Sequence, residues 1–333
     1  MTASAAALPD PSQAHKAART VGFMLVRSFS LIAFTSAVEP LRLANRAAGR
    51  ALYAWPLFSG DGGPVTASNG VEVAVSRSFA EARGLDLALV CAGLDVQTAD
   101  HRALMAAMRR LASFGAGVGA VCTGSYVLAR AGLLDGYRAT IHWENLPTLQ
   151  AEFPGLDLRQ ELFEIDRTRL TCAGGTAAAD MMLSLILRDH GAELASEVTE
   201  QMIHHRIRES GERQRMDLRT RLGVAHPKLV KVVGLMEGAI EHPLSSTELA
   251  AQVDLSTRQL ERLFCRHLGH PPTRHYLRLR LARARQLLRQ TGTPILSVAL
   301  ACGFTSASHF SKSYLDHFGH TPTAERRRVA EPA

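Results

Sequence analysis

The sequence predicts an α/β domain with a largely parallel sheet, followed by an all-α domain that contains two helix-turn-helix motifs. In the N-terminal two-thirds, short apolar runs alternate with helix-like patterns, which is typical of folds that alternate strand and helix. Near the C-terminus, one helix-turn-helix pattern occurs twice, on either side of an arginine-rich helix. All of the net positive charge lies in the same C-terminal region. Residues 226–333 hold 15 Lys and Arg against 8 Asp and Glu, whereas residues 1–225 hold 23 of each. A neutral body with a basic end is typical of a chain in which one domain meets phosphates.

Length and composition set the number of domains. A chain of 333 residues, of which 46% are hydrophobic, exceeds one core and suggests two domains at roughly 150 residues each. It has no apolar run of about 18 residues and no apolar leader, so we expect a cytoplasmic protein without membrane association, whose residues 1–19 are disordered. Five cysteines, an odd number without a Cys-x-x-Cys pair, argue against disulfides and a metal site. We expect no cofactor.

The strands and helices of the N-terminal domain follow from its apolar patterns. The predicted strands are 20–26, 85–91 and 118–121, with another strand that the chain leaves at 139–141, just before His142; a helix is predicted over 31–47. The strand ending at Val121 leads into a tight turn with Cys122 at its tip and a helix over 125–131, which is the pattern of a nucleophile elbow. Such a turn exposes the cysteine and aims backbone N–H groups into the same pocket, and both favour a nearby anion. The alternative is a structural cysteine, since free Cys is usually buried.

The first helix-turn-helix motif can be placed from its capping residues. Ser245 and Glu248 have the spacing of a capping box, ahead of an apolar helix that ends near Val253. After a turn, Ser256 can cap a second helix whose apolar positions share one face. The residues that this helix turns outward suit base edges and phosphates; they are Arg258, Gln259, Glu261 and Arg262.

The second motif repeats the first with one residue inserted in its turn. It opens at Pro294, turns at Gly303, and Ser306 starts its second helix. The exposed residues of that helix are Ala307, Ser308, His309 and Lys312. Between the motifs, a basic helix of about 17 residues spans roughly 25 Å, so with its flanking turns it could hold the two motifs about one DNA turn, roughly 34 Å, apart.

Over residues 228–328 the chain resembles the AraC/XylS family of transcription regulators. The resemblance rests on the segments 249–256, 269–276, 280–288 and 301–314. It implies that the two exposed residue sets contact two grooves of double-stranded DNA. One departure is Glu325, where many family members have an aromatic residue. A solvated charged face would also explain a single arginine run, but not its coincidence with two helix-turn-helix motifs.

Over residues 21–191 the chain resembles the PfpI-like, class I glutamine amidotransferase-like superfamily, on the segments 37–45, 122–136, 139–145 and 171–182. The resemblance implies that Glu39, Cys122 and His142 converge at the elbow, where the enzymes of that superfamily carry the nucleophile and its partners. Hydrolases of the PfpI type have His directly after the cysteine, whereas this chain has Thr123. A thiol needs a base at hydrogen-bond distance to act as a nucleophile, which His142 could supply.

The missing histidine favours a hydrolase scaffold that is reused as a non-catalytic sensor. A cysteine hydrolase or amidase tethered to DNA remains the alternative. A constitutive DNA-binding protein with an inactive sensor domain is a third possibility.

Together the two resemblances identify an AraC-type regulator with an amidotransferase-like sensor, similar to regulators of glycine betaine, carnitine or arginine catabolism. They imply an activator that responds to a small amine or amino-acid derivative. The elbow amides suit a carboxylate, while Glu39 and Trp143 could hold a cationic end by charge and cation–π attraction. A Trp after a strand can equally be part of the core. The ligand-binding candidates are Glu39, Cys122, Thr123, His142 and Trp143.

The expected domain boundaries are a sensing domain over 20–208, a linker over 209–227 and a DNA-binding domain over 228–328. The linker is placed by its polar, charged sequence and its glycines. Helices predicted over 176–189 and 193–208 could either cover the sheet or form a dimer face. We expect a homodimer, with RNA polymerase as a further partner. The effector, the operator and the sign of regulation are left open by the sequence.

Overall fold

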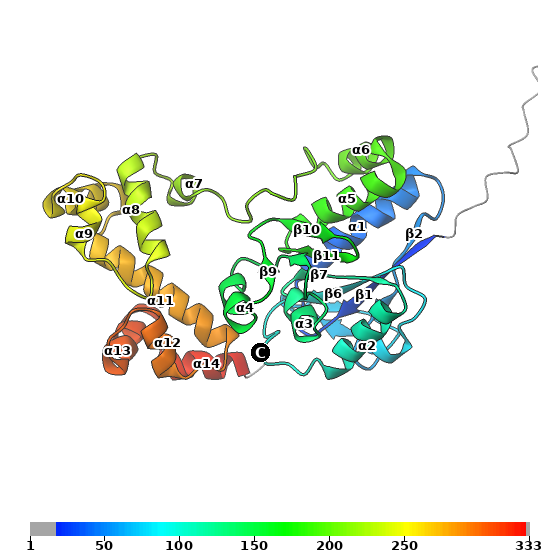
Figure 1. Ribbon diagram of the computed structural model, residues 1–333, viewed down its shortest axis with the longest axis horizontal. Coiled ribbons are helices and arrows are strands. Elements are labelled where there is room, and N and C mark those ends of the chain that lie inside the picture. Colours follow the sequence, from blue (N-terminus) through cyan, green and yellow to red (C-terminus); the bar gives the residue numbers. More distant parts are fainter. Residues whose placement is uncertain (1–17, 331–333) are drawn as a thin grey trace, which may run out of the picture.

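The computed structural model describes residues 18–330 of the chain, with side chains as far as residue 327. It contains an α/β domain and a helical domain, which lie side by side and are joined by one extended segment (Figure 1). Most of the stretch predicted to be disordered, 1–19, lies outside the described residues. Arg19, its last residue, begins the first strand, where its N–H donates to the carbonyl of Leu52 at 2.8 Å.

A seven-stranded sheet forms the centre of the N-terminal domain. Its strands are β1 (Arg19–Leu25), β2 (Tyr53–Ala54), β3 (Leu57–Phe58), β6 (Leu87–Ala92), β7 (Gly117–Cys122), β10 (Phe163–Asp166) and β11 (Arg169–Cys172). The order is β10-β11-β7-β6-β1-β2, with β3 also paired to β1, and only β10 and β11 pair antiparallel. The prediction of a largely parallel sheet is therefore confirmed.

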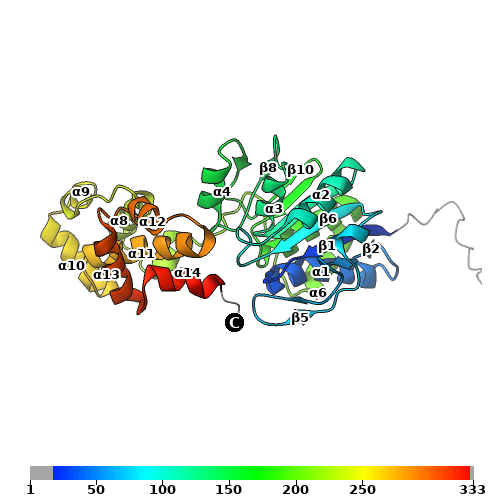
Figure 2. The same cartoon turned by 90° about the horizontal axis from the view of Figure 1, so that it is seen from below.

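Helices cover both faces of this sheet (Figures 1 and 2). One face carries α1 (Leu31–Ala47), α5 (Ala177–His190) and α6 (Ala192–Gln201), and the other carries η1 (Phe79–Glu81), α2 (Arg102–Ser113), α3 (Ser125–Arg130) and α4 (Leu146–Glu152). Every residue of β6 is buried, as expected for a parallel strand between two helical layers. Helix α1 has the predicted bounds because the Ser30 hydroxyl accepts from the Ala33 N–H at its start.

Two predictions about this domain are wrong in detail. The strand expected before His142 is only β8 (Arg138–Ala139), which pairs with β9 (Asp157–Leu158) outside the main sheet. A further two-stranded sheet joins β4 (Val65–Thr66) to β5 (Glu72–Val73). The helix predicted over 193–208 ends at Gln201, because Ile203 adopts the left-handed conformation with φ +53° and turns the chain back over the domain.

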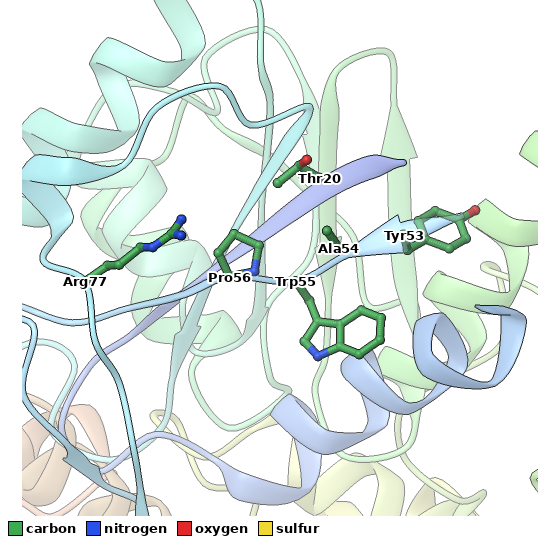
Figure 3. Close-up of a pocket in the computed structure, with 6 residues that line it drawn as sticks. All are labelled: Thr20, Tyr53, Ala54, Trp55, Pro56 and Arg77. Carbon is green, nitrogen blue, oxygen red and sulfur yellow. The ribbon is translucent and has the colours of Figure 1, made fainter. Parts of the chain in front are cut away.

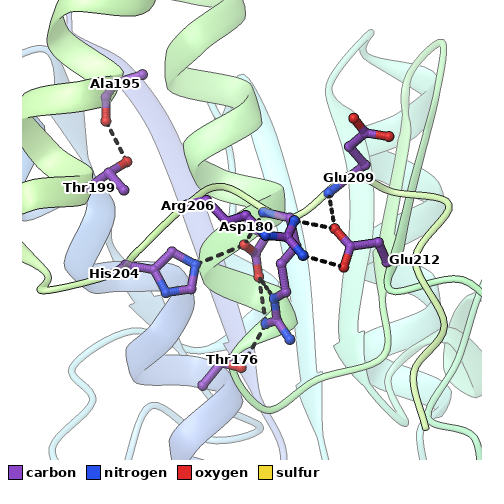
Figure 4. Close-up of polar contacts among 9 residues, drawn as sticks. Thr176, Asp180, Ala195, Thr199, His204, Arg206, Glu209 and Glu212 are labelled. Carbon is purple, nitrogen blue, oxygen red and sulfur yellow. Dashed lines mark hydrogen bonds and ion pairs between the residues drawn. The ribbon is translucent and has the colours of Figure 1, made fainter. Parts of the chain in front are cut away.

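The buried carboxylate of Asp180 holds this returning segment in place (Figure 4). It accepts from His204 Nε2 at 2.9 Å and from the Arg208 guanidinium at 2.6 Å. Arg206 then pairs with Glu212 at 2.8 Å, and the Gln214 amide donates to two main-chain carbonyls and to Thr140. The first residues of the expected linker, 209–214, are thus attached to the α/β domain.

The helical domain contains two helix-turn-helix motifs, at the two ends of one long helix (Figure 1). Its helices are α7 (Leu218–Leu222), α8 (Pro227–Gly238), α9 (Ser246–Ala251), α10 (Thr257–Leu268), α11 (Pro272–Gln290), α12 (Ile295–Ala301), α13 (Ala307–Phe318) and α14 (Pro322–Ala330). The pairs α9–α10 and α12–α13 form the motifs, each with its own buried cluster against α11. The predicted caps are present, since Ser245, Ser256 and Ser306 each accept from a main-chain N–H three residues on.

The turns of the two motifs are equivalent despite the inserted residue. Asp254 in the first and Gly303 in the second both adopt positive φ, at +52° and +74°. At Gly303 a Cβ atom would lie 2.5 Å from the Pro243 side chain, so the second turn also needs glycine for space. In the part of the chain that the structure describes, no helix combines the length and apolar character needed to cross a bilayer.

Candidate functional site

Cys122 stands on the strand-turn-helix elbow that its sequence predicts. It ends β7, has φ +59°, and is followed three residues later by the first residue of α3. The turn is this tight because Gly124 passes directly over β6: a Cβ there would lie 2.4 Å from the Val90 carbonyl oxygen. On the other side, a Cβ at Gly174 would lie 2.7 Å from that of Cys122. The elbow is therefore enclosed by backbone on two sides.

The surroundings of Cys122 keep its thiol protonated. Burial raises its pKa to about 11, although the Thr123 N–H and the Ser30 hydroxyl favour the thiolate. The negative charge of Glu144 raises the pKa further. Burial also lowers the pKa of His142, so that its imidazole is neutral near pH 7. Because the thiolate is the reactive form of cysteine, the raised pKa of Cys122 disfavours the reactive form near neutral pH.

Thr123 and His142, two of the other predicted residues, also make hydrogen bonds that hold the elbow in place. The Thr123 hydroxyl donates to the carbonyl of Gly93 at 2.7 Å. The His142 N–H donates to the carbonyl of Cys122 at 3.2 Å, and its ring lies 5.6 Å from that of Trp143. Cys122, Thr123, His142 and Trp143 all line one cavity.

Glu39 does not join them, and the expected convergence is wrong for this residue. Its side chain is 45% exposed on α1, pairs with Arg42 at 2.6 Å, and is not part of the cavity wall. The pairing is local, since residues three apart on a helix are neighbours. Asp95 and Glu144 supply carboxylates to the cavity instead. Glu144 lies within the same short motif as His142, which is the sequence signal that could have indicated it.

This cavity is a cleft of about 2250 Å³ between the two domains. The α/β domain contributes the elbow and the segment around Trp143, and α11 contributes a row of cationic and amide side chains. The α11 residues of the row are Arg283, Arg285, Gln286, Arg289 and Gln290. At one end of the cleft the two domains touch, where the Gln290 amide donates to the Asn145 side chain at 3.3 Å.

A smaller cavity of about 400 Å³ lies at the edge of the sheet (Figure 3). Its lining is Thr20, Tyr53, Ala54, Trp55, Pro56 and Arg77. None of the candidate residues belongs to it.

The structure places all eight predicted DNA-contacting residues on exposed surface, four on α10 and four on α13. Among the described side chains, residues 18–327, Arg258, Arg262 and Lys312 take part in no ion pair, so their charges remain available to phosphates or bases. The side-chain oxygen of Gln259 already accepts a hydrogen bond from the Ser256 N–H at 2.8 Å, so only part of this side chain is available to DNA.

An α/β domain that shares an interdomain cleft with paired helix-turn-helix motifs, whose recognition helices carry free cationic side chains, defines a transcription regulator. Known proteins agree: the DJ-1/PfpI family matches residues 19–188, and a helix-turn-helix domain matches residues 249–328. The chain belongs to the HTH-type transcriptional regulators that join a DJ-1/PfpI domain to an AraC-type DNA-binding domain.

Three relatives from Pseudomonas aeruginosa illustrate this family. CdhR is 49% identical over 91% of this chain and 90% of its own length. GbdR is 47% identical over 93% and 84%, and ArgR is 43% identical over 92% and 93%. All three are HTH-type transcriptional regulators.

Two solved structures resemble the α/β part. An AraC family transcriptional regulator from Pseudomonas putida is 32% identical with a TM-score of 0.52, covering 55% of this chain and 99% of that one. Drosophila melanogaster DJ-1beta is 19% identical with a TM-score of 0.50, covering 57% and 100%, and shares the fold.

Proposed function

We propose that a small amine or amino-acid derivative, such as a betaine, carnitine or arginine, binds in the Cys122 cleft and regulates the paired DNA-binding motifs. The supporting observation is that α11, which carries both motifs, forms one wall of this cleft. A ligand there contacts both domains, and it shifts their arrangement by its differential affinity for the two states. We further propose that the protein is an activator, acts as a homodimer and contacts RNA polymerase.

The polarity of the cleft supports a zwitterionic or amino-acid-like ligand. The Arg283 guanidinium of α11, which pairs with no carboxylate among the described side chains, offers positive charge to a ligand carboxylate. On the opposite wall, Trp143 offers an aromatic face and Glu144 a carboxylate to a cationic end. A thermal-shift screen of the full-length protein against glycine betaine, carnitine, arginine and related amines tests this directly. Stabilisation by none of them would contradict the proposed effector class.

We also propose that the α/β domain does not catalyse a reaction, and replacing Cys122 by serine tests this. Because the thiol is held protonated, we expect the wild-type protein to hydrolyse amide and ester substrates no faster than the Cys122→Ser variant. We expect promoter binding to be equal in the two proteins, since Cys122 belongs to the α/β domain and not to either recognition helix. Steady-state hydrolysis assays and promoter titrations measure both. Turnover in the wild type that disappears in the variant would show the alternative, a cysteine hydrolase.

Replacing Trp143 by alanine should weaken the effector response. A cation–π contact contributes about 0.5–2 kcal/mol, so we expect effector affinity to fall by roughly two- to thirtyfold while promoter binding persists. The matched control is Trp55→Ala, which removes the other tryptophan at the smaller cavity. Calorimetric titration with the effector found in the screen gives the affinities. Equal losses in the two variants would remove Trp143 from the site.

A further inference from the structure

The aromatic face of Trp143 is already covered by a cation of the protein itself. The Arg215 guanidinium lies over the indole ring, with Cζ 4.4 Å from the ring centroid. Both residues line the interdomain cleft. Tryptophan is the best aromatic partner for a cation, and 4.4 Å is well within the range of about 6 Å for this attraction. The subsite that would attract a ligand's cationic end therefore holds a side chain of the linker.

Arg215 connects the two domains through this contact. On the other side, one of its guanidinium nitrogens lies 4.0 Å from the carboxylate of Glu237 on α8, in the helical domain. Burial and the positive charge of Arg221, which itself pairs with Glu237 at 2.8 Å, lower the pKa of Arg215, while the charges of Glu237 and Glu144 raise it. The residue thus lies between an indole and a carboxylate of the α/β domain and a carboxylate of the DNA-binding domain.

The chain around Arg215 is arranged so that a change there would alter the connection between domains. Just before it, Gln214 is fixed to the α/β domain by three hydrogen bonds of its amide. Just after it, Met216 and Asp217 are exposed, and α7 begins at Leu218. Leu218 and Leu222 pack against the core of the first helix-turn-helix motif. Arg215 is therefore at the boundary where the linker passes from one domain to the other.

We infer that Arg215 is a built-in competitor of the effector: its guanidinium occupies the Trp143 face that the effector's cationic end takes, and effector binding releases it. This inference rests on the proposed function, which places the effector in the same cleft. Release is feasible because the Arg215 side chain is 40% exposed and can regain water. Once displaced, Arg215 no longer holds the linker to the α/β domain. The ligand class that fits is an organic cation, with or without a carboxylate.

Competition of this kind has a measurable consequence. A ligand that binds only when Arg215 is displaced shows an affinity reduced by the fraction of molecules in that state. Replacing Arg215 by an uncharged residue should therefore restore the full affinity for the ligand. For a cation–π contact of about 1–2 kcal/mol, the expected gain is about five- to thirtyfold in affinity.

The test uses the full-length protein with Trp55→Phe, which leaves Trp143 as the only tryptophan. In this background, Arg215→Gln is compared with Arg219→Gln, which removes the same charge four residues along, at an exposed position outside the cleft. The fluorescence of Trp143 is followed during titration with tetramethylammonium, with glycine betaine and with 3,3-dimethylbutanoate, in which carbon replaces the betaine nitrogen.

We expect Arg215→Gln, and not Arg219→Gln, to bind tetramethylammonium and glycine betaine about five- to thirtyfold more tightly, with no such gain for 3,3-dimethylbutanoate. If tetramethylammonium leaves Trp143 unaffected in Arg215→Gln, the inference is overturned. If glycine betaine binds equally to both variants, the inference also fails, while the proposed effector class stands. If tetramethylammonium shows the gain but glycine betaine binds to neither variant, the inference stands and glycine betaine is excluded as the effector.

Discussion

Replacing Glu325 by leucine is expected to destabilise the second helix-turn-helix motif by about 3 kcal/mol, because it removes the carboxylate that joins three helices. The side chain of Glu325 is 1% exposed. It accepts hydrogen bonds from α11, from α13 and from the turn that precedes α14; the donors are Arg285, Arg289, Tyr314 and His320. Leucine would leave the buried Tyr314 hydroxyl without this acceptor and the two arginines without their counter-charge.

The pKa of the Glu325 carboxyl indicates a contribution to stability of the same size. Burial alone would raise its pKa, but the hydrogen bonds from His320, the arginines and Tyr314 outweigh burial and lower the pKa to about 2. A folded-state pKa below the unfolded value of 4.5 adds stability that is fully present above about pH 4.5. That stability, about 3 kcal/mol, is lost as the pH falls from about 4.5 to about 2.

Hydrogen exchange of the full-length protein, read by mass spectrometry over α12–α14, measures this effect. The control is Asp316→Leu, which removes an exposed acidic side chain of α13 and should change stability by less than about 0.5 kcal/mol. We expect exchange in α12–α14 to increase in Glu325→Leu alone, and in the wild type only below about pH 4.5. Similar exchange in the two variants would show that the carboxylate cluster contributes little.

Local signals explain why the helix-turn-helix motifs could be predicted closely. A serine cap fixes the start of a helix through a hydrogen bond between residues only three positions apart. The caps at Ser245, Ser256 and Ser306 all form. The same holds for α1 after Ser30 and for the elbow at Cys122, where strand, turn and helix are consecutive. Such features depend on neighbouring residues, so one sequence is enough to indicate them.

Long-range pairing explains what the sequence could not indicate. Glu325 departs from the aromatic residue expected there, and its role depends on Arg285 and Arg289, some 40 positions earlier. The sequence shows those arginines only as part of a basic helix, whereas in the structure they pair with a buried carboxylate of the same domain. Arg280 also bonds within the domain, donating to the carbonyls of Cys302 and Gly303 at the second turn. The basic charge of α11 is thus partly structural.

The cleft shows the same division between local and distant contacts. His142 and Trp143 follow the elbow region closely in sequence and do line the cavity, whereas Glu39, chosen by motif, pairs with its own helix neighbour. Arg215 enters the cleft from a segment that its composition marked only as linker. The return of the chain over residues 203–214 depends on the buried Asp180, and charged sequence alone does not distinguish such a strap from a free linker.

Removing one cation from each recognition helix should show that both motifs contact DNA. We expect Arg262→Ala and Lys312→Ala each to weaken promoter binding by about 1–3 kcal/mol, which is roughly five- to 150-fold. Both side chains are exposed and belong to different motifs, held apart by α11, whose 19 residues are about 28 Å long. Residues this far apart act independently, so the double variant should lose close to the sum of the two energies.

Promoter titrations at several salt concentrations and footprinting of the wild type measure these effects. A lost phosphate contact should reduce the slope of log affinity against log salt by about 1. The wild type should protect two segments about ten base pairs apart, the spacing of successive major grooves on one DNA face. Arg50→Ala, an exposed arginine of the α/β domain, is the control and should bind as the wild type does. If only one of the two substitutions weakened binding, a single motif would enter the DNA, and α11 would not be the spacer between two groove contacts.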